Sequence, residues 1–331
     1  MADSTTRADL QEERQRWGAG LSKQSSYVRR TRLADRIANN IFLICAILIV
    51  VIILAVFIFV GINGFQMFNL DPHSKNFLTS AVWDPQGNKG PTSYGMLGFI
   101  LGSVVTTALA VIISTPLAFG MALFMTEVTP KWLENILRPL LEIFTGMPSV
   151  IIGFLALVSI TPILRDAFGK NSPIPAIGGY GWAAAVIVLI IMILPTIISV
   201  SIDALRAVPS SVREASLALG SSRWQMMRNA VLPAASTGLA TAVVLGMTRA
   251  IGEALAVSMV LKGNADLPKN LFSLSAFFQP NINMTLPIVL NFPDASGAER
   301  DAYFMVGFLL LVISFLFVCI SRYLASRSVY K

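Results

Sequence analysis

The sequence has little charge, histidine or cysteine, and each shortage excludes a class of protein. Charged residues make up 13% of its 331 positions, whereas a soluble domain carries roughly 25%. The single histidine, His73, lies in a polar stretch, and both cysteines, Cys45 and Cys319, lie within apolar runs. We therefore expect neither a metal site nor a structural disulfide. No cluster of His, Cys or Ser lies near a plausible base, so we expect no catalytic residues.

A phosphate-binding loop is also absent. The pattern Gly-x-x-x-x-Gly-Lys-Ser/Thr does not occur, and the dipeptide Gly169-Lys170 lies between apolar runs on the expected outer side. Any ATP and Mg²⁺ must then be used by separate subunits, and we expect no cofactor to be bound by this chain.

Long apolar runs are what the sequence does contain, since 55% of its residues are hydrophobic. A run of ~20 apolar residues can cross a bilayer as a helix. Backbone groups in lipid must pair within their own segment, and the alternation of a β-barrel is missing, so helices are expected. The fold class is therefore an all-α membrane protein with six transmembrane helices. The six runs are 41–60, 97–124, 140–160, 182–200, 232–260 and 303–321.

The basic residues predict the orientation of these helices. The net charge of +7 is spread between apolar blocks, which favours orientation in membrane lipid over nucleic-acid binding. With the amino terminus inside, 17 Lys and Arg lie on the inner side and 7 on the outer side, so both termini are expected in the cytoplasm. The expected parts are a polar cytoplasmic tail 1–36, a first transmembrane helix 37–60, an extracytoplasmic segment 61–96, a permease core 97–322 with a second extracytoplasmic segment 261–302, and a cytoplasmic tail 323–331.

The cytoplasmic loop 203–232 has signals for two short helices. Ser210 and Ser211 after Pro209 predict a helix start with a serine cap, and Gly220 is typical of a helix end. Ser221-Ser222 can cap a second short helix, and Pro233 suits the start of the next span.

This loop resembles the EAA loop of ABC-importer permeases, in which Glu-Ala-Ala, Gly and Leu-Pro recur at fixed spacing. Glu214-Ala215-Ser216, Gly220 and Leu232-Pro233 match that spacing, while Ser216 and Ala230 depart from it. The resemblance implies that the first short helix inserts into a groove on an ATP-binding subunit; the alternative is an ordinary interfacial helix. The coupling residues so implied are Arg213, Glu214, Ala215, Ser216, Ala218, Gly220, Leu232 and Pro233.

Two charged residues, Arg249 and Glu253, lie inside the fifth run. A central charge costs ~3 kcal/mol on membrane-insertion scales. Four residues apart, the two can pair on one helix face, and in a helix unbroken from Pro233 Arg249 would lie about 24 Å along it. One interpretation is an oxyanion pathway, because a guanidinium matches a tetrahedral anion, with Glu253 holding Arg249 when the path is empty. The other is a structural ion pair that locks two helices together.

The segment Arg249-Ala-Ile-Gly-Glu253-Ala-Leu-Ala-Val257 resembles one in phosphate-specific (Pst) permeases, especially the C-type subunit, PstC. Ala254-Leu255 depart from its Thr-Met, while the segments 124–130 and 142–153 agree with the same family. Pro148 interrupts the third run, and a helix start there could offer N–H groups to an anion, which makes Gly146 and Ser149 candidate pathway residues. A simple kink is the alternative.

The resemblance implies a MetI-like fold and a phosphate permease that works by alternating access. It implies a heterodimer with an A-type permease subunit, two ATP-binding subunits and an extracytoplasmic phosphate-binding protein. Sulfate, molybdate or tungstate are alternative cargoes. A secondary transporter or channel is a further alternative, and it would not need the motif 214–220.

Overall fold

The computed structural model describes residues 3–70, 75–87, 90–168, 178–262 and 274–326. The chain divides into two compact units, Met1–Phe59 and Val60–Lys331. The first unit is the amino-terminal part of helix α1 (Asp3–Leu70), which continues into the second unit. The first predicted span lies in this helix, whose apolar stretch runs from Ile37 to Leu70.

Within the described residues, five helices are long and apolar enough to cross a membrane, and the number is six if a bent pair counts as one span. On that count the predicted helical membrane fold with six spans is confirmed. The spans after α1 are α2 (Leu97–Leu123) with the π-helical η2 (Phe124–Val128); α4 (Ser149–Leu155), η3 (Ala156–Ile160) and α5 (Thr161–Ala167); α6 (Trp182–Arg206); α8 (Arg223–Met226), η4 (Met227–Val231) and α9 (Leu232–Ala234) bent against α10 (Ser236–Gly252); and α14 (Gly297–Ser326).

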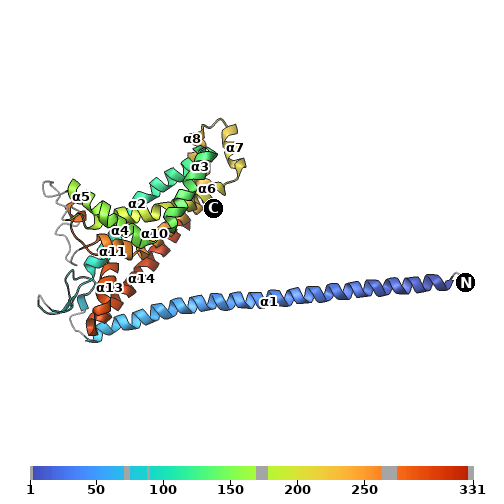
Figure 1. Ribbon diagram of the computed structural model, residues 1–331, viewed down its shortest axis with the longest axis horizontal. Helices are drawn as coiled ribbons and strands as arrows, with labels where there is room; N and C mark the ends of the chain where they lie inside the picture. Colours follow the sequence, from blue (N-terminus) through green and yellow to red (C-terminus); the bar gives the residue numbers. More distant parts are fainter. Residues whose placement is uncertain (1–2, 71–74, 88–89, 169–177, 263–273, 327–331) are drawn as a thin grey trace. The chain divides into compact units, whose positions relative to one another are not determined.

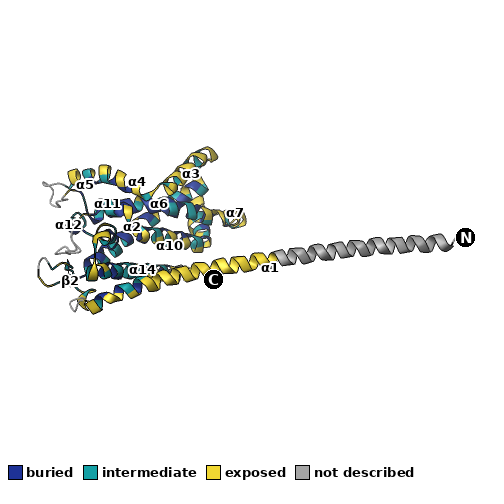
Figure 2. Ribbon diagram, turned by 60° about the horizontal axis from the view of Figure 1, so that its bottom comes forward, coloured by how far each residue is buried: buried dark blue, intermediate teal, exposed yellow. Residues whose placement is uncertain are grey.

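Shorter elements join these spans. They are the two-stranded antiparallel hairpin β1 (Trp83–Asp84) and β2 (Ser93–Tyr94), which pairs Trp83 with Tyr94, and the helices α3 (Lys131–Gly146), α7 (Ser210–Ala218), α11 (Leu255–Val260), α12 (Leu274–Phe277), α13 (Thr285–Asn291) and η5 (Phe292–Asp294). The helices α7 and α8 lie at one end of the bundle and the hairpin at the other (Figures 1 and 2).

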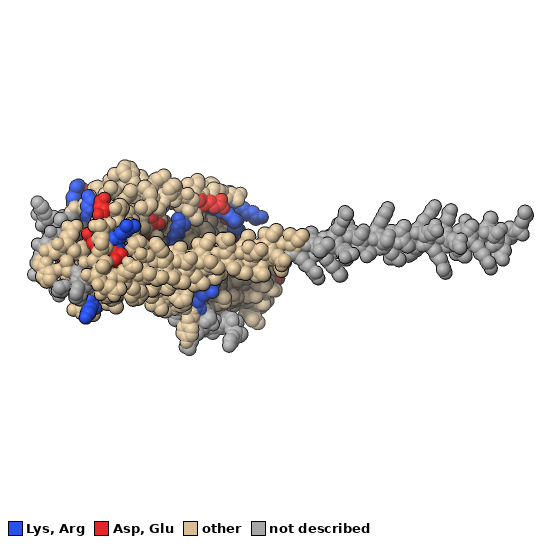
Figure 3. Space-filling model, turned by 90° about the horizontal axis from the view of Figure 1, so that it is seen from below, with Lys and Arg blue, Asp and Glu red and all other residues tan. Residues whose placement is uncertain are grey.

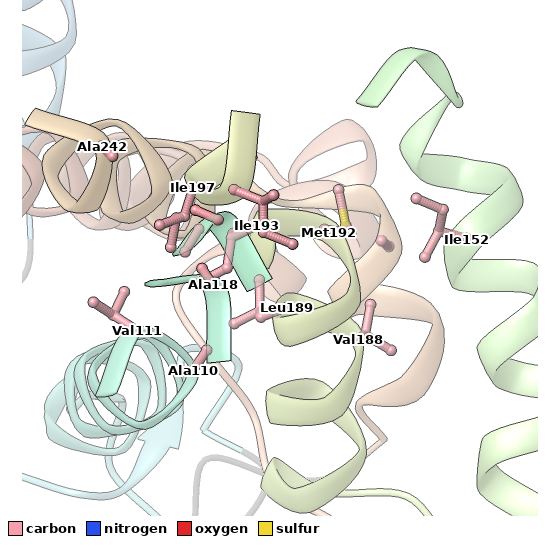
Figure 4. Close-up of a cluster of buried hydrophobic side chains, with 14 of the residues drawn as sticks. Ala110, Val111, Ala118, Ile152, Val188, Leu189, Met192, Ile193, Ile197 and Ala242 are labelled. Atoms are coloured by element: carbon pink, nitrogen blue, oxygen red, sulfur yellow. The ribbon is translucent and has the colours of Figure 1, made fainter. Parts of the chain in front are cut away.

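Helices α2, α6 and α10 pack together as the core of the second unit. Figure 4 shows Ala110 and Ala118 of α2 facing Leu189 and Ile193 of α6. Lipid tails are as apolar as leucine, so van der Waals packing of small residues holds such helices together. Most of α6 is buried, whereas α3 and α7 carry no buried residue (Figure 2).

Two predicted spans differ from the observed helices. The third run, expected at 140–160, is split: residues 140–146 end α3, and the membrane-length helix runs from Ser149 to Ala167. Met147 and Pro148 have extended backbones between them, because a residue before proline is driven out of the helical region.

The fifth run was expected to form one unbroken helix, with Arg249 about 24 Å from Pro233. The structure breaks this helix. The chain bends by 71° after Ala234, and α10 then ends at Gly252. Arg249 therefore lies in the last turn of α10, about 20 Å along the helix from Ser236.

Candidate functional site

The guanidinium of Arg249 joins three elements of the fold. Its Nη1 donates a hydrogen bond to Oγ1 of Thr196 in α6 at 2.8 Å, and its Nη2 donates to the carbonyl oxygen of Thr145 at 3.4 Å. Thr145 lies in the last turn of α3, where a cation is favoured by the helix dipole. The side chain is half-buried. Its positive charge is hydrogen-bonded to neutral acceptors where α10, α6 and α3 meet.

Glu253 does not pair with Arg249, although both residues are described. No ion pair joins them in the described part of the chain. Glu253 leaves the helix with φ −78° and ψ 111°, and its Oε1 accepts a hydrogen bond of 3.1 Å from the backbone N–H of Ala256 in α11. The predicted pairing is therefore wrong: the carboxylate instead satisfies an unbonded N–H at the start of the next helix.

The helix break between α3 and α4 lies beside Arg249. Gly146 ends α3 directly after Thr145, and Ser149 begins α4. The structure thus brings Gly146 next to the carbonyl that Arg249 contacts. Ser149 does not cap α4, because the residue before the helix is Pro148 and no side chain bonds there.

The two broken spans pack on each other through Gly153 of α4. A Cβ atom at Gly153 would lie 2.6 Å from Cα of Ala256 in α11 and 3.1 Å from Sδ of Met259. Only glycine allows this approach, which sets α4 directly against the helix that Glu253 caps. Discontinuous helices that meet in this way are where membrane transporters commonly bind ions.

Replacing Gly153 with leucine is expected to destabilise the protein, because the side chain would enter the backbone of α11. Overpacking of this kind costs about 1–3 kcal/mol, which corresponds to a melting temperature lower by roughly 2–10 °C. The control is Gly120→Leu in α2, whose Cβ would meet no atom within 4 Å. Thermal unfolding of the two purified variants in detergent checks the prediction, and equal melting temperatures would contradict it.

The loop 203–232 folds as two short helices around a glycine bend, as predicted. Helix α7 spans Ser210–Ala218, and Gly220 has φ +84°, a value that residues with a side chain rarely adopt. Ser222 and Gln225 form a reciprocal capping box with bonds of 2.9 and 3.3 Å. The cap expected at Ser210 or Ser211 is absent, because Pro209 precedes α7 and no side chain bonds there.

Four of the eight implied coupling residues are exposed. Glu214, Ala215, Ala218 and Gly220 are exposed, while Ser216 is half-buried with its hydroxyl 3.3 Å from that of Ser221. Leu232 and Pro233 lie in α9, at the bend before α10. The loop also exposes three large apolar side chains, which are Leu217, Leu219 and Trp224.

The guanidinium of Arg213, by contrast, turns inward. Nε and Nη2 donate to Oε1 of Glu127 at 3.1 and 2.9 Å. Nη1 donates to the carbonyl of Val208 at 2.7 Å, and Nη2 to that of Leu205 at 2.9 Å. Arg213 therefore ties α7 to η2 and to the end of α6.

Three partners of these side chains were not predicted: the carbonyl of Thr145, the hydroxyl of Thr196 and the carboxylate of Glu127. Glu127 stands in the segment 124–130, which the sequence analysis singled out without giving this residue a role. Thr196 follows Pro195, a helix-interior proline that marks an irregular position. Figure 3 shows how sparse charged side chains are on the visible described surface, where they gather in a few small groups.

Comparison with known proteins gives consistent matches. Residues 114–330 match the family "Binding-protein-dependent transport system inner membrane component". The probable ABC transporter permease protein YqgH of Bacillus subtilis is 39% identical over 90% of this chain and 94% of that protein. The phosphate transport system permease protein PstC of Haemophilus influenzae is 30% identical over 93% and 98%.

Solved structures share the fold at low sequence identity. The bacterial ABC transporter involved in the import of the acidic polysaccharide alginate matches with a TM-score of 0.59 and 15% identity, over 90% of this chain and 100% of that chain. The MetNI methionine ABC transporter matches with a TM-score of 0.54 and 17% identity, over 71% and 96%.

Proposed function

Because the chain belongs to the family of inner membrane components of binding-protein-dependent transport systems, we propose that it is the permease subunit through which an ABC importer moves inorganic phosphate. Relatives named as phosphate transport permeases align with almost the whole chain, which supports this cargo. The likeness to ABC transporter structures supports the architecture alone.

The observation that carries the proposal is the half-buried guanidinium of Arg249 at the junction of two broken helices. Its contact with the Thr145 carbonyl is long, at 3.4 Å, so an oxyanion can replace that carbonyl at little cost. A guanidinium bonds a tetrahedral anion through two parallel N–H groups. Alternating access then exposes Arg249 to the outside and to the cytoplasm in turn.

Glu253 has a different part in this proposal. Its carboxylate occupies the first turn of α11, where backbone N–H groups and the helix dipole would otherwise attract an anion. A transport site must bind its cargo weakly enough to release it. Glu253 keeps the helix start neutralised, so that the anion is held by Arg249 alone and can leave. Gly146 and Ser149 lie at the neighbouring break and complete the proposed pathway.

The proposed assembly is a heterodimer with an A-type permease subunit, two ATP-binding subunits and an extracytoplasmic phosphate-binding protein. The exposed loop residues Leu217, Leu219 and Trp224 provide apolar area for the ATP-binding subunit, which binds ATP and Mg²⁺. In this arrangement the chain lies in the cytoplasmic membrane, and both termini are cytoplasmic.

The experiment is uptake by the complete transporter in proteoliposomes that contain ATP. Labelled phosphate should accumulate only with ATP and the phosphate-loaded binding protein, and excess sulfate or molybdate should not compete. Competition by either anion would overturn phosphate as the cargo. Accumulation without ATP would overturn the ABC mechanism in favour of a secondary transporter.

Thr196 offers a separate check on the pathway. Thr196→Val removes the hydroxyl that accepts the 2.8 Å bond from Arg249 at nearly constant volume. A hydrogen bond to a charged group contributes about 1.5 kcal/mol, so uptake should fall about tenfold. Thr196→Ser keeps the hydroxyl and should retain uptake. Equal uptake by the two variants at matched expression would show that the guanidinium needs no such support.

A further inference from the structure

We infer that Arg213 is a positioning residue that fastens the coupling helix α7 to α6, so that α6 carries the ATP-driven movement to Arg249. The inference rests on the proposed function, because it assigns a route between the ATP-binding subunit and the pathway. It departs from the sequence-based expectation that Arg213 belongs to the surface facing that subunit.

The hydrogen bonds of Arg213 point into the permease. Four bonds connect its guanidinium to Glu127, Leu205 and Val208, and a guanidinium has five N–H groups in all. Only 23% of the side chain is exposed. Little of its bonding capacity is left for another protein, so Arg213 acts within the chain.

Two of these bonds go to carbonyl groups at the end of α6. Leu205 is in the final turn of the helix, where its carbonyl also accepts a bond of 3.3 Å from the backbone N–H of Val208, and Val208 lies just beyond the helix. Arg213 donates to both carbonyls and places its positive charge at the negative end of the helix dipole. Residues 207–209 are the covalent connection between α6 and α7, and Arg213 adds a connection through its side chain.

Glu127 fixes the same guanidinium from a second span. Its side chain is 10% exposed, and a carboxylate so enclosed needs a paired cation. Glu127 belongs to η2, which continues α2. Arg213 therefore joins α7 to the ends of both α2 and α6, the two helices that pack most extensively on each other.

Helix α6 reaches from this fastening to the pathway. Thr196, which bonds Arg249, lies nine residues before Leu205, or about 14 Å along a continuous helix. Packed helices transmit displacement as rigid bodies. A push on α7 is thus delivered through Arg213 to α6, and through Thr196 to the guanidinium that holds the anion.

The chain provides a matched control at the same helix end. Arg206, the last residue of α6, forms an ion pair with Glu134 of α3. The pair is more exposed, at 38% and 24%, and it joins α6 to α3 rather than to the coupling helix. Loss of Arg206 removes a similar charge without separating α7 from α6.

The test measures phosphate moved per ATP hydrolysed in the complete transporter, in proteoliposomes supplied with phosphate-loaded binding protein. Arg213→Gln should lower this ratio about tenfold, as expected for loss of charge-assisted bonds, while ATP hydrolysis continues. Arg213→Lys has one ammonium for three acceptors, so its ratio should lie between that of Arg213→Gln and that of the native protein. Arg206→Gln should keep the native ratio.

Two outcomes would overturn the inference. In the first, ATP hydrolysis and transport by Arg213→Gln fall in proportion. In the second, Arg213→Gln moves as much phosphate per ATP hydrolysed as Arg206→Gln does.

If Arg213→Gln does not assemble, Glu127→Gln decides, because it keeps an acceptor oxygen but loses the charge. It should lower the ratio by less than tenfold, and a native ratio would again overturn the inference. If the native transporter moves sulfate or molybdate instead, the proposed cargo fails, but the ratio measured with that anion still tests the fastening.

Discussion

Replacing Arg249 with glutamine is expected to reduce phosphate uptake about 100-fold, because an oxyanion loses a charge-assisted contact worth up to about 3 kcal/mol. Assembly should survive the change. Removing a charge from a membrane helix does not oppose insertion, and the glutamine amide can still donate to a nearby acceptor such as Thr196. The measurement is initial uptake of labelled phosphate at matched membrane levels of the transporter, with co-purification of its ATP-binding subunits.

Arg249→Lys is the matched control for this prediction. It keeps the positive charge but lacks the planar pair of N–H donors that fits phosphate. It also cannot reach Thr196 and Thr145 with two separate donor arms. Uptake should therefore lie between that of the glutamine variant and the native protein. Normal uptake by Arg249→Gln would defeat the pathway assignment, whatever the lysine variant does.

Replacing Gly220 with aspartate is expected to uncouple the transporter, with uptake reduced about 100-fold. The position is open, since a Cβ there meets no atom of the described chain within 4 Å, so the effect cannot come from a clash within the permease. The effect arises at the proposed contact with the ATP-binding subunit, to which the neighbouring exposed side chains of Leu219 and Trp224 contribute. An unpaired carboxylate buried at a protein interface costs several kcal/mol, and each 1.4 kcal/mol is tenfold in affinity.

Gly220→Asn separates charge from backbone strain. At φ +84° both asparagine and aspartate carry a similar penalty, and both are among the residues that tolerate this region best. Asparagine adds no charge, so it should retain most uptake and bind the ATP-binding subunit. The measurements are co-purification of that subunit and uptake. An aspartate variant that co-purifies and transports like the asparagine variant would show that Gly220 does not face the ATP-binding subunit.

The fold of the proposed coupling loop, residues 203–232, was largely predictable from local signals. Gly220 marked the end of α7, and the capping box of Ser222 and Gln225 occurs where Ser221-Ser222 predicted a second helix start. Such signals work because their hydrogen bonds join residues three or four apart. The predicted cap at Ser210 failed for a similarly local reason, because Pro209 takes the capping position and has no side-chain acceptor.

The site proposed as the substrate pathway was only partly predictable from the sequence. Arg249 stood out because a charge is rare in an apolar run, but its pairing with Glu253 assumed that the helix continues. Instead, α10 ends at Gly252, and Glu253 accepts a hydrogen bond from the backbone N–H of Ala256 at the start of α11. No proline marks this break, unlike the one at Pro148, so periodicity alone predicted an intact helix.

The amino-acid sequence alone was enough to predict a membrane protein with six helical spans and to single out charged residues that stand where lipid should be. Hydropathy, charge distribution and capping are properties of short segments, so they need no knowledge of the fold. The partners of these charges depend on how the helices pack. Those of Arg249 lie 53 and 104 positions away, and Glu127, the charged partner of Arg213, lies 86 positions away. Packing of distant helices, not spacing along one helix, brings these groups within bonding distance.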